Sequence, residues 1–287
     1  MTVQSAQSPP SLLEKAALVL GAFQGATPRL TLTEVVRRSG LPRSSVHRIL
    51  DQLVQLGWLE RDGRDYRLGM GMLELGAMAA HHNRLRRAAL PHLHALHEKT
   101  GHVVHLAVLD GPEVVYLERL GGIADASVPS RIGGRQPAYC TATGKAILAF
   151  GEAALVAEVL RAGLRPRTAY TLTRPGPFRA ELARIRERGV AFDREESFRG
   201  VACVAAPLRG AGRAIAAVSV CGNGLHRELE RLAPAVRGTS RAIWASLYGP
   251  GRAAAVPRTA AAPVPEPALE PAQMDTMMSW MRFAEWM

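Results

Sequence analysis

The sequence predicts an α+β fold in which a small, mainly helical N-terminal domain precedes a larger domain built around an antiparallel sheet. Residues 11–57 carry three apolar stripes at helical spacing, and a short alternating run that indicates a hairpin follows them. From residue 101 the apolar period changes to two, and strands then occur among helices without regular strand–helix alternation. The chain of 287 residues is long enough for two such domains, each with its own core.

The composition indicates a soluble globular protein, because 47% of the residues are apolar and 21% are charged. No run approaches the ~18 apolar residues of a membrane span, and the N-terminus lacks the basic and apolar segments of a signal peptide. The sequence therefore predicts a cytoplasmic protein without membrane contact. Its three cysteines, Cys140, Cys203 and Cys221, lie far apart and are odd in number, which favours reduced thiols over a disulfide framework.

The net charge of +11 does not by itself locate a nucleic-acid surface. Only two of these net charges belong to residues 1–83, so most of the excess lies in the second domain. A solvated arginine-rich surface accounts for that excess, although a basic protein also suits a phosphate-bearing partner.

The N-terminal domain is expected over residues 11–68, after a flexible segment at residues 1–10. Ser11 and Glu14 have the spacing of a capping box at the start of a first helix. Thr31 and Glu34 repeat this spacing at a second helix, which Ser39-Gly40 ends.

A third helix follows, with Pro42 expected at its first position. Its apolar positions are spaced to share one buried face: Val46, Ile49, Leu50, Leu53 and Leu56. The opposite face begins with basic and hydroxyl side chains and has no acid before Asp51: Arg43, Ser44, Ser45, His47 and Arg48. This composition is typical of a recognition helix whose N-terminal half enters a DNA major groove, and a solvated helix face is the alternative.

Two short alternating runs on either side of Asp62-Gly63 predict a hairpin next to this helix. Three helices and a hairpin, in this order, make up a winged helix-turn-helix domain, and the arginines of the wing are within reach of a DNA backbone. The predicted DNA-binding residues are Thr31, Thr33, Arg43, Ser44, Ser45, His47, Arg48, Arg61, Arg64 and Arg67.

A linker helix is expected over residues 69–83, and the second domain over residues 84–249. Pro91 should kink the helix at residues 84–100 or begin a new segment. The further elements expected are strands at 102–109, 113–119 and 126–132, a helix opening at Thr141, helices near 152–162 and 177–188, strands at 190–193, 201–208 and 214–221, and a closing helix at 227–247.

The last residues do not continue this pattern. Residues 250–273 are rich in Ala and Pro and are expected to form a linker. Residues 274–287 are apolar again, with methionines at helical spacing, and are expected to form an amphipathic tail. This tail either frays and packs on itself or docks as a helix on a partner subunit or the second domain.

The segment Thr141-Ala-Thr-Gly144 lies where a strand gives way to a helix, a place suited to a carboxylate or another anion. Lys145 is reminiscent of a phosphate-binding loop, but Tyr139 and Ala146 stand where that loop needs Gly and Ser or Thr. Nucleotide hydrolysis is therefore not expected. Neither a metal nor a cofactor is predicted, because these histidines have no coherent ligand spacing: His92, His94, His97, His102 and His105.

Over residues 11–248 the sequence resembles transcriptional regulators of the IclR type. The resemblance rests on the order and spacing of six segments: Leu30-Thr-Leu-Thr-Glu-Val, Gly40-Leu-Pro-Arg-Ser-Ser-Val-His-Arg-Ile-Leu, Tyr66-Arg-Leu-Gly, Thr143-Gly-Lys-Ala, Arg188-Gly-Val-Ala-Phe-Asp-Arg-Glu-Glu and Cys203-Val-Ala-Ala-Pro. It implies a winged helix-turn-helix domain, a linker helix and a GAF-like effector-binding domain. It also implies homodimers that pair through the N-terminal domains and commonly assemble into tetramers. Nothing is implied for the tail after Gly249.

The resemblance further implies a pocket for a small organic effector, a carboxylate or an aromatic compound. The positions that would line it are Thr141, Ala142, Thr143, Gly144, Asp193, Cys203, Ser219 and Cys221. Many relatives carry Ser where this chain has Cys221, so the pocket should be less polar here and less suited to a very small keto acid. Buried thiols that pack as small hydrophobic groups are the alternative for Cys203 and Cys221.

Together these features predict a regulator, repressor or activator, that binds a palindromic operator and responds to a small molecule. Two other hypotheses remain at this point. One is a ligand-independent regulator controlled through a partner or the C-terminal tail. The other is an enzyme with a fused DNA-binding head, which would need a nucleophile–base pair or a metal set within residues 100–248. No such set stands out there, and no catalytic residue is predicted.

Overall fold

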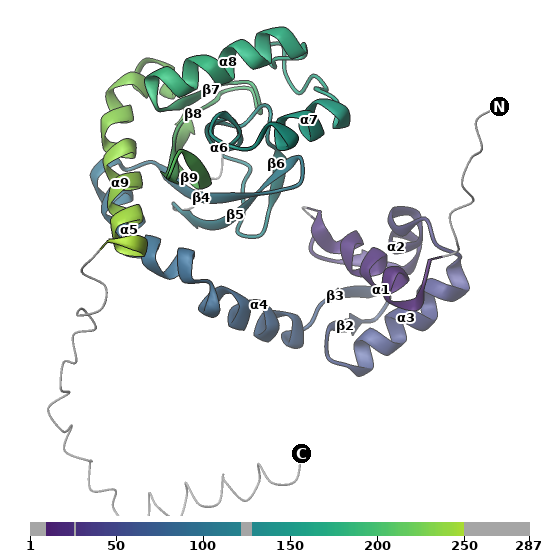
Figure 1. Ribbon diagram of the computed structural model, residues 1–287. Helices are drawn as coiled ribbons and strands as arrows, with labels where there is room; N and C mark the ends of the chain where they lie inside the picture. The colour runs from purple at the N-terminus through teal and green to yellow at the C-terminus, as the bar shows by residue number, and fades with distance from the viewer. Residues whose placement is uncertain (1–9, 26, 122–127, 250–287) are drawn as a thin grey trace, which may run out of the picture. The chain divides into compact units, whose positions relative to one another are not determined.

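A computed structural model of the chain describes residues 10–25, 27–121 and 128–249 (Figure 1). The expectations for residues 1–9, for the linker at 250–273 and for the tail at 274–287 lie outside the described residues. Within the described part, no helix combines the length and the apolar character that a membrane crossing requires.

The N-terminal domain has the predicted order of helices and hairpin. Its elements are α1 (Leu12–Gly21), the short 3-10 helix η1 (Ala22–Gln24), β1 (Leu30–Thr31), α2 (Leu32–Ser39), α3 (Arg43–Gln55), β2 (Leu59–Asp62) and β3 (Asp65–Leu68). The three strands form an antiparallel sheet in the order β1-β3-β2. One apolar cluster, which includes Val35, Leu50 and Leu59, holds the helices against this sheet.

Both predicted capping boxes are confirmed. The backbone N–H of Ser11 donates to Glu14 Oε2 at 2.7 Å, and that of Thr31 donates to Glu34 Oε2 at 2.8 Å. In each case the hydroxyl oxygen accepts in return from the backbone of the glutamate. Gly40 ends α2 in the left-handed conformation that favours glycine, with φ of 68°. These ends were predictable because each depends only on residues a few positions apart.

Two details of the prediction for α3 are wrong. Pro42 is the N-cap residue and not the first helical residue, so α3 begins at Arg43. Leu56 is 63% exposed, whereas Leu50 is fully buried. Leu56 is the C-cap of α3, and Gly57 then turns the chain with a positive φ, so the helical period that aligns the apolar stripe ends before Leu56.

The linker helix α4 (Met70–His82) has no buried residue, and α5 (Arg84–Thr100) follows it. The start of α4 is fixed by Gly69, where a Cβ would lie 2.4 Å from the carbonyl oxygen of Gly57. The helix α5 runs through Pro91 as one element, so the alternative of a new segment is wrong. Pro91 is exposed, and solvent can therefore satisfy the carbonyl that loses its helical partner.

The second domain is built on one antiparallel sheet of six strands in the order β6-β5-β4-β9-β8-β7. These strands are β4 (Val103–Asp110), β5 (Glu113–Leu120), β6 (Arg135–Pro137), β7 (Ala191–Arg194), β8 (Val201–Gly210) and β9 (Arg213–Asn223). The strand expected at residues 126–132 is wrong in its described part, because residues 128–132 form no strand. Gly133 and Gly134 make the first backbone hydrogen bonds to Tyr116 of β5, so the pairing begins only after the Gly-Gly turn.

Helices cover both faces of this sheet, as Figure 1 shows. One face packs against α5 and the closing helix α9 (Leu229–Tyr248), which follows the 3-10 helix η3 (Leu225–Arg227). The other face packs against α6 (Ala142–Ala149), α7 (Ala153–Ala162) and α8 (Pro175–Arg188). Alternate residues of a strand face opposite layers, so Cys203 of β8 lies on the α6 side whereas Val204 lies on the α9 side.

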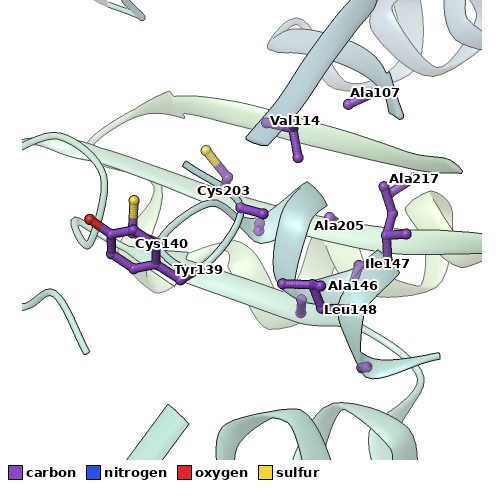
Figure 2. Close-up of a cluster of buried hydrophobic side chains, with 14 of the residues drawn as sticks. Ala107, Val114, Tyr139, Cys140, Ala146, Ile147, Leu148, Cys203, Ala205 and Ala217 are labelled. Atoms are coloured by element: carbon purple, nitrogen blue, oxygen red, sulfur yellow. The ribbon is translucent and has the colours of Figure 1, made fainter. Parts of the chain in front are cut away.

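Helix α6 lies against the middle of the sheet, and Figure 2 shows the contact. Its side chains Ala146, Ile147 and Leu148 pack among residues of the strands, including Ala205 and Ala217. All eight residues of α6 are buried. The helix is therefore an internal element of the second domain, with its N-terminal end fixed by the core around it.

The exposure of Leu56 leads to a direct test against Leu50. Leu50→Ala should lower the unfolding free energy of the N-terminal domain by about 2–5 kcal/mol, because it leaves a cavity in a closed core. Leu56→Ala should change it by less than about 0.5 kcal/mol, since an exposed side chain loses few contacts. Hydrogen exchange of the α3 amides in the full-length chain measures both effects, and equal losses would contradict the assignment of Leu56 to the surface.

Candidate functional site

The first two turns of α3 present a polar, basic face to solvent. Arg43, Ser44, His47 and Arg48 are exposed and Ser45 is half-buried, while Val46, Ile49 and Leu50 on the same helix are buried. No acidic residue lies in the first turn. The positive end of the helix dipole therefore adds to the charge of the arginines, which suits an approaching phosphate backbone.

Other predicted DNA-binding residues surround this face. The Thr31 hydroxyl takes part in the capping box with Glu34, so its role in the described structure is to fix the start of α2. Thr33 is exposed and accepts a hydrogen bond from Arg43 at 3.3 Å. His47 lies 3.0 Å from Asp51, which fixes its ring on the outer surface of α3.

The three wing arginines are exposed on the β2–β3 hairpin. Arg61 donates to the carbonyl of Gly63 at 3.1 Å, and Arg67 donates to Glu60 at 2.8 Å. Arg64 lies in the turn between the strands. The guanidinium groups are held at the hairpin surface, where a duplex could reach them.

A second candidate site lies in the other domain, at the N-terminal end of α6. The Thr141 side chain caps this helix by accepting from the Gly144 N–H at 3.2 Å. Lys145 N donates to the Thr141 carbonyl, so the N–H groups of Ala142 and Thr143 are the remaining donors of the first turn. Such donors, at the positive end of a helix, favour an anionic group.

The α6 terminus forms one wall of a pocket with an enclosed volume of about 20 Å³. Seven of the eight predicted effector-binding residues line it: Thr141, Ala142, Thr143, Asp193, Cys203, Ser219 and Cys221. Gly144 lies behind the wall, where a Cβ would meet the carbonyl oxygen of Ala138 at 2.2 Å. Its function in the described structure is thus to let α6 approach the preceding chain closely.

Sequence reasoning missed several polar residues of the same pocket: His105, Tyr116, Ser130 and Ser197. The His105 ring bonds to Ser130 Oγ at 2.7 Å and approaches Ser219 Oγ at 3.4 Å. A usable signal existed, because His105 alternates with the apolar Val103 and Ala107 on the inner face of β4. A histidine at an inward position of an apolar strand indicates a polar pocket.

Asp193 lines this pocket and is almost fully buried. Burial raises its pKa to about 7, against the opposing effects of Lys145 and of hydrogen bonds from Ser197 and from the backbone of Glu196. The Lys145 side chain is itself fully buried and forms an ion pair with Glu196. Lys145 is therefore directed into the core, unlike the lysine of a phosphate-binding loop.

Cys203 and Cys221 lie directly opposite each other on β8 and β9. A hydrogen bond to Cys221 and burial raise the pKa of the Cys203 thiol. Burial also opposes ionisation of Cys221, but hydrogen bonds from Cys203, His105 and Ser219 outweigh it and lower the pKa of this thiol. Both cysteines line the pocket, and the Cys221 sulfur lies 3.6 Å from Ser219 Oγ.

The histidines named in the sequence analysis do not converge. His92 bonds to Ser246, and His97 Nδ1 bonds to the His102 carbonyl at 2.8 Å. Among the residues that the structure describes, no group of three or more His, Cys, Asp or Glu side chains has an arrangement that could hold a metal ion.

Two family models match the chain and together cover both domains. Residues 12–63 match the IclR helix-turn-helix domain, and residues 77–245 match the C-terminal domain of bacterial IclR transcriptional regulators. The chain belongs to the IclR family. It is therefore a transcriptional regulator with a DNA-binding helix-turn-helix domain, and the resemblance inferred from the sequence is confirmed.

Several IclR-family proteins are similar over most of their length. The HTH-type transcriptional regulator XynR of Escherichia coli is 36% identical over 72% of this chain and 84% of its own. The Pca regulon regulatory protein of Pseudomonas putida is 32% identical over 83% and 84%, respectively. A crystal structure of an IclR homologue from Microbacterium hydrocarbonoxydans in complex with 4-hydroxybenzoate has a TM-score of 0.73 and 32% identity, and the match covers 83% of this chain and 99% of that one. These relatives confirm the α+β fold.

The raised pKa of Asp193 predicts how stability depends on pH. In the unfolded chain this group deprotonates near 3.8, but in the folded protein near 7, so the folded state retains a proton over this interval. The unfolding free energy of the wild type, relative to Asp193→Asn, should therefore fall as pH rises from about 4 to about 7 and level off above, at about 1.4 kcal/mol per pKa unit. Urea titrations of both proteins across this range measure the difference, and a rise with pH would contradict the assignment.

Proposed function

We propose that this IclR-family regulator binds a palindromic operator through α3 and the wing, and that a small organic carboxylate bound beside α6 controls this binding. The observation that carries the proposal is the pocket at the α6 N-terminus, in which helical N–H donors face buried polar side chains. A DNA-binding head and a buried polar pocket in one chain make a ligand-controlled regulator the simplest function.

The operator proposal rests on the exposed face of α3. Arg48 and Arg43 carry guanidinium groups suited to guanine edges or phosphates, and the Ser44 and Ser45 hydroxyls suit either contact. A recognition helix in the major groove with a wing beside it uses the exposed side chains of α3 and the arginines of the hairpin together. The solvated-face alternative leaves the complete order of helices and hairpin unexplained.

A homodimer, further assembled as a dimer of dimers, is proposed from the linker helix. Met70, Leu73, Leu75 and Met78 of α4 are all between 49% and 64% exposed, and α4 has no buried residue. A helix this apolar favours a partner surface. A second copy of the chain would pair two recognition helices, which is the symmetry that a palindromic operator requires.

The effector class follows from the donors and charges around the pocket. The N–H groups of Ala142 and Thr143 and the dipole of α6 favour a carboxylate, while His105 and Ser219 offer further hydrogen bonds. Because the pKa of Asp193 is raised to about 7, much of this group is protonated near neutral pH and does not repel an incoming anion. A relative with 32% identity binds 4-hydroxybenzoate, which supports an aromatic acid for this chain.

Effector binding must change the shape of this pocket. Ligand pockets for organic molecules are usually about 300 Å³ or larger, whereas the cavity here encloses about 20 Å³. An aromatic acid can therefore bind only to a conformation in which the walls have moved. The effector then shifts the balance between two conformations by its differential affinity, and the linker helix passes this shift to the DNA-binding domains.

We also infer that the chain acts in the cytoplasm and catalyses no reaction. Its relatives are transcriptional regulators, whose activity is binding. No observation supports the alternative hypothesis that the chain is an enzyme with a DNA-binding head. The alternative hypothesis that the regulator is controlled by its tail concerns residues 274–287, outside the described part of the chain.

Replacement of Arg48 tests the DNA interface. Operators selected from a random duplex library on the wild type should bind Arg48→Ala at least tenfold more weakly, since one good base or phosphate contact contributes about 1–3 kcal/mol. Gel-shift titration measures this loss. Arg231→Ala, which removes an equal charge from α9, is the matched control and should bind as the wild type does. Equal affinity of the Arg48→Ala protein would contradict the proposal.

Two ligands that differ in one functional group test whether the pocket recognises a carboxylate. Calorimetric titration should show that 4-hydroxybenzoate binds at least tenfold more tightly than 4-hydroxybenzamide, because the neutral amide gains less from the positive end of α6. The benzoate should also change operator affinity in gel shifts, while the benzamide should not at the same concentration. Equal binding of both compounds would remove the α6 terminus as the carboxylate site. If benzoates and other small aromatic acids leave the operator affinity unchanged, the proposal that an effector controls DNA binding is contradicted.

A further inference from the structure

Cys203 and Cys221 lie opposite each other on neighbouring strands, at a Cα spacing compatible with a disulfide. They are register partners on the antiparallel strands β8 and β9, and both lie on the α6 side of the sheet. Facing residues of antiparallel strands have Cα atoms about 4.5–5.5 Å apart, within the 4.4–6.8 Å that disulfides span. Because both side chains leave the same face of two paired strands, a bond between the sulfurs needs no change of strand register.

The surroundings of the pair favour a nucleophilic sulfur. The Cys221 sulfur lies 3.6 Å from Ser219 Oγ, and the influence of Cys203, His105 and Ser219 lowers the pKa of this thiol. Cys140 has the opposite environment: it is fully buried, its sulfur lies 3.6 Å from the Pro137 carbonyl, and burial raises its pKa to about 12. The reactive form of cysteine is the thiolate, so Cys221 is the reactive residue and Cys140 an inert reference in the same chain.

Access to the pair is by way of the pocket. Both thiols line the cavity of about 20 Å³, which is enough space for a molecule as small as water or hydrogen peroxide. The cavity is too small for a large oxidant or for a second protein chain. The products of oxidation are thereby limited to those that a small oxidant and the two neighbouring sulfurs can form.

We propose that Cys203 and Cys221 form a reversible redox site, which a hydroperoxide converts to an intramolecular disulfide between β8 and β9. The Cys221 thiolate attacks one peroxide oxygen, the O–O bond breaks, and the other oxygen leaves as an alcohol or water after taking up a proton. Cys203 sulfur then attacks the resulting sulfenic acid, and the S–O bond breaks. The departing hydroxide takes the proton of Cys203 and leaves as water. In total, two thiols are oxidised to one disulfide while one peroxide O–O bond is reduced.

The disulfide would alter the effector pocket, and this consequence rests on the proposed function. Bond formation brings the sulfurs to about 2.05 Å and removes both thiol hydrogens from the pocket wall. A dithiol could then regenerate the reduced pair by exchange. The chemical step itself needs neither effector nor DNA, so its failure is distinguishable from failure of the proposed function.

The test is a thiol count and a peptide map of the full-length protein after treatment with hydrogen peroxide. Free thiols, counted after denaturation, should fall from three to one and return to three with dithiothreitol. Trypsin cleaves after Arg209 and Arg213 and so places the two cysteines on separate peptides. These peptides should be recovered joined, with a loss of two hydrogen atoms, while the Cys140 peptide carries the alkylating label.

Three variants complete the experiment. Cys140→Ser should still lose both of its thiols, whereas Cys221→Ser should keep both of its own. Cys203→Ser should accumulate a sulfenic acid on Cys221 that dimedone traps. The proposal would be overturned if all three thiols of the wild type survived peroxide. Formation of sulfinic acid without the joined peptide, or of a disulfide that contains Cys140, would also overturn it.

Discussion

The second domain depends on the close placement of α6 against the sheet. Gly144 allows this approach, because any Cβ there would collide with the backbone of Ala138. One turn into the helix, Lys145 has no exposed surface and directs its ammonium group to Glu196, on the loop after β7. An unpaired buried charge is strongly destabilising, so the ion pair ties this loop to α6. The pocket lies between these two elements.

The balance of charge around Lys145 determines the state of the pocket. Its field lowers the pKa values of Asp193, Glu196 and Glu181, while burial raises them. Glu181 is also paired with Arg184 and Arg188 and remains ionised, but Asp193 forms no ion pair with any residue of the described part of the chain. Because Lys145 is already paired with Glu196, burial of Asp193 costs the least free energy when its carboxyl group is protonated. A group that holds a proton near neutral pH therefore faces the ligand.

Local features of the fold were predictable from sequence, whereas pairings between distant strands were not. The capping boxes of Ser11 and Thr31 and the termination of α2 at Gly40 depend on residues within one or two turns. Leu56 shows the limit of periodicity, because the pattern continues in the sequence after the helix has ended. Pro91 shows another limit: its cost depends on whether solvent reaches the freed carbonyl, and the sequence does not state which side of α5 is exposed.

The pocket was also predicted only in part, because the contacts that form it join residues that are distant in the sequence. The segment at residues 141–144 was predicted as an anion site from its place between a strand and a helix, but its assembly with Asp193, Cys203, Ser219 and Cys221 was inferred from family resemblance. No property of the sequence neighbourhood brings Thr141 next to Cys221. The contribution of His105 depends on the pairing of β4 with β9, which places it opposite Ser219 across more than a hundred residues of chain. An inward polar residue on a strand can be recognised from alternation, but its partner is fixed only when the strands are in register.

The walls of the pocket differ in how easily they can move. Cys203, Ser219 and Cys221 belong to β8 and β9, which pair from Val201↔Asn223 to the hairpin end, so these strands cannot separate without breaking a continuous ladder. The loop after β7 is held by the Lys145–Glu196 ion pair and by Asp193, which accepts hydrogen bonds from the Glu196 and Ser197 backbone and from the Ser197 hydroxyl. These bonds are stronger to a carboxylate than to a carboxylic acid. Enlargement of the cavity should therefore move this loop rather than the strands, and protonation of Asp193 weakens one of the contacts that resist this movement.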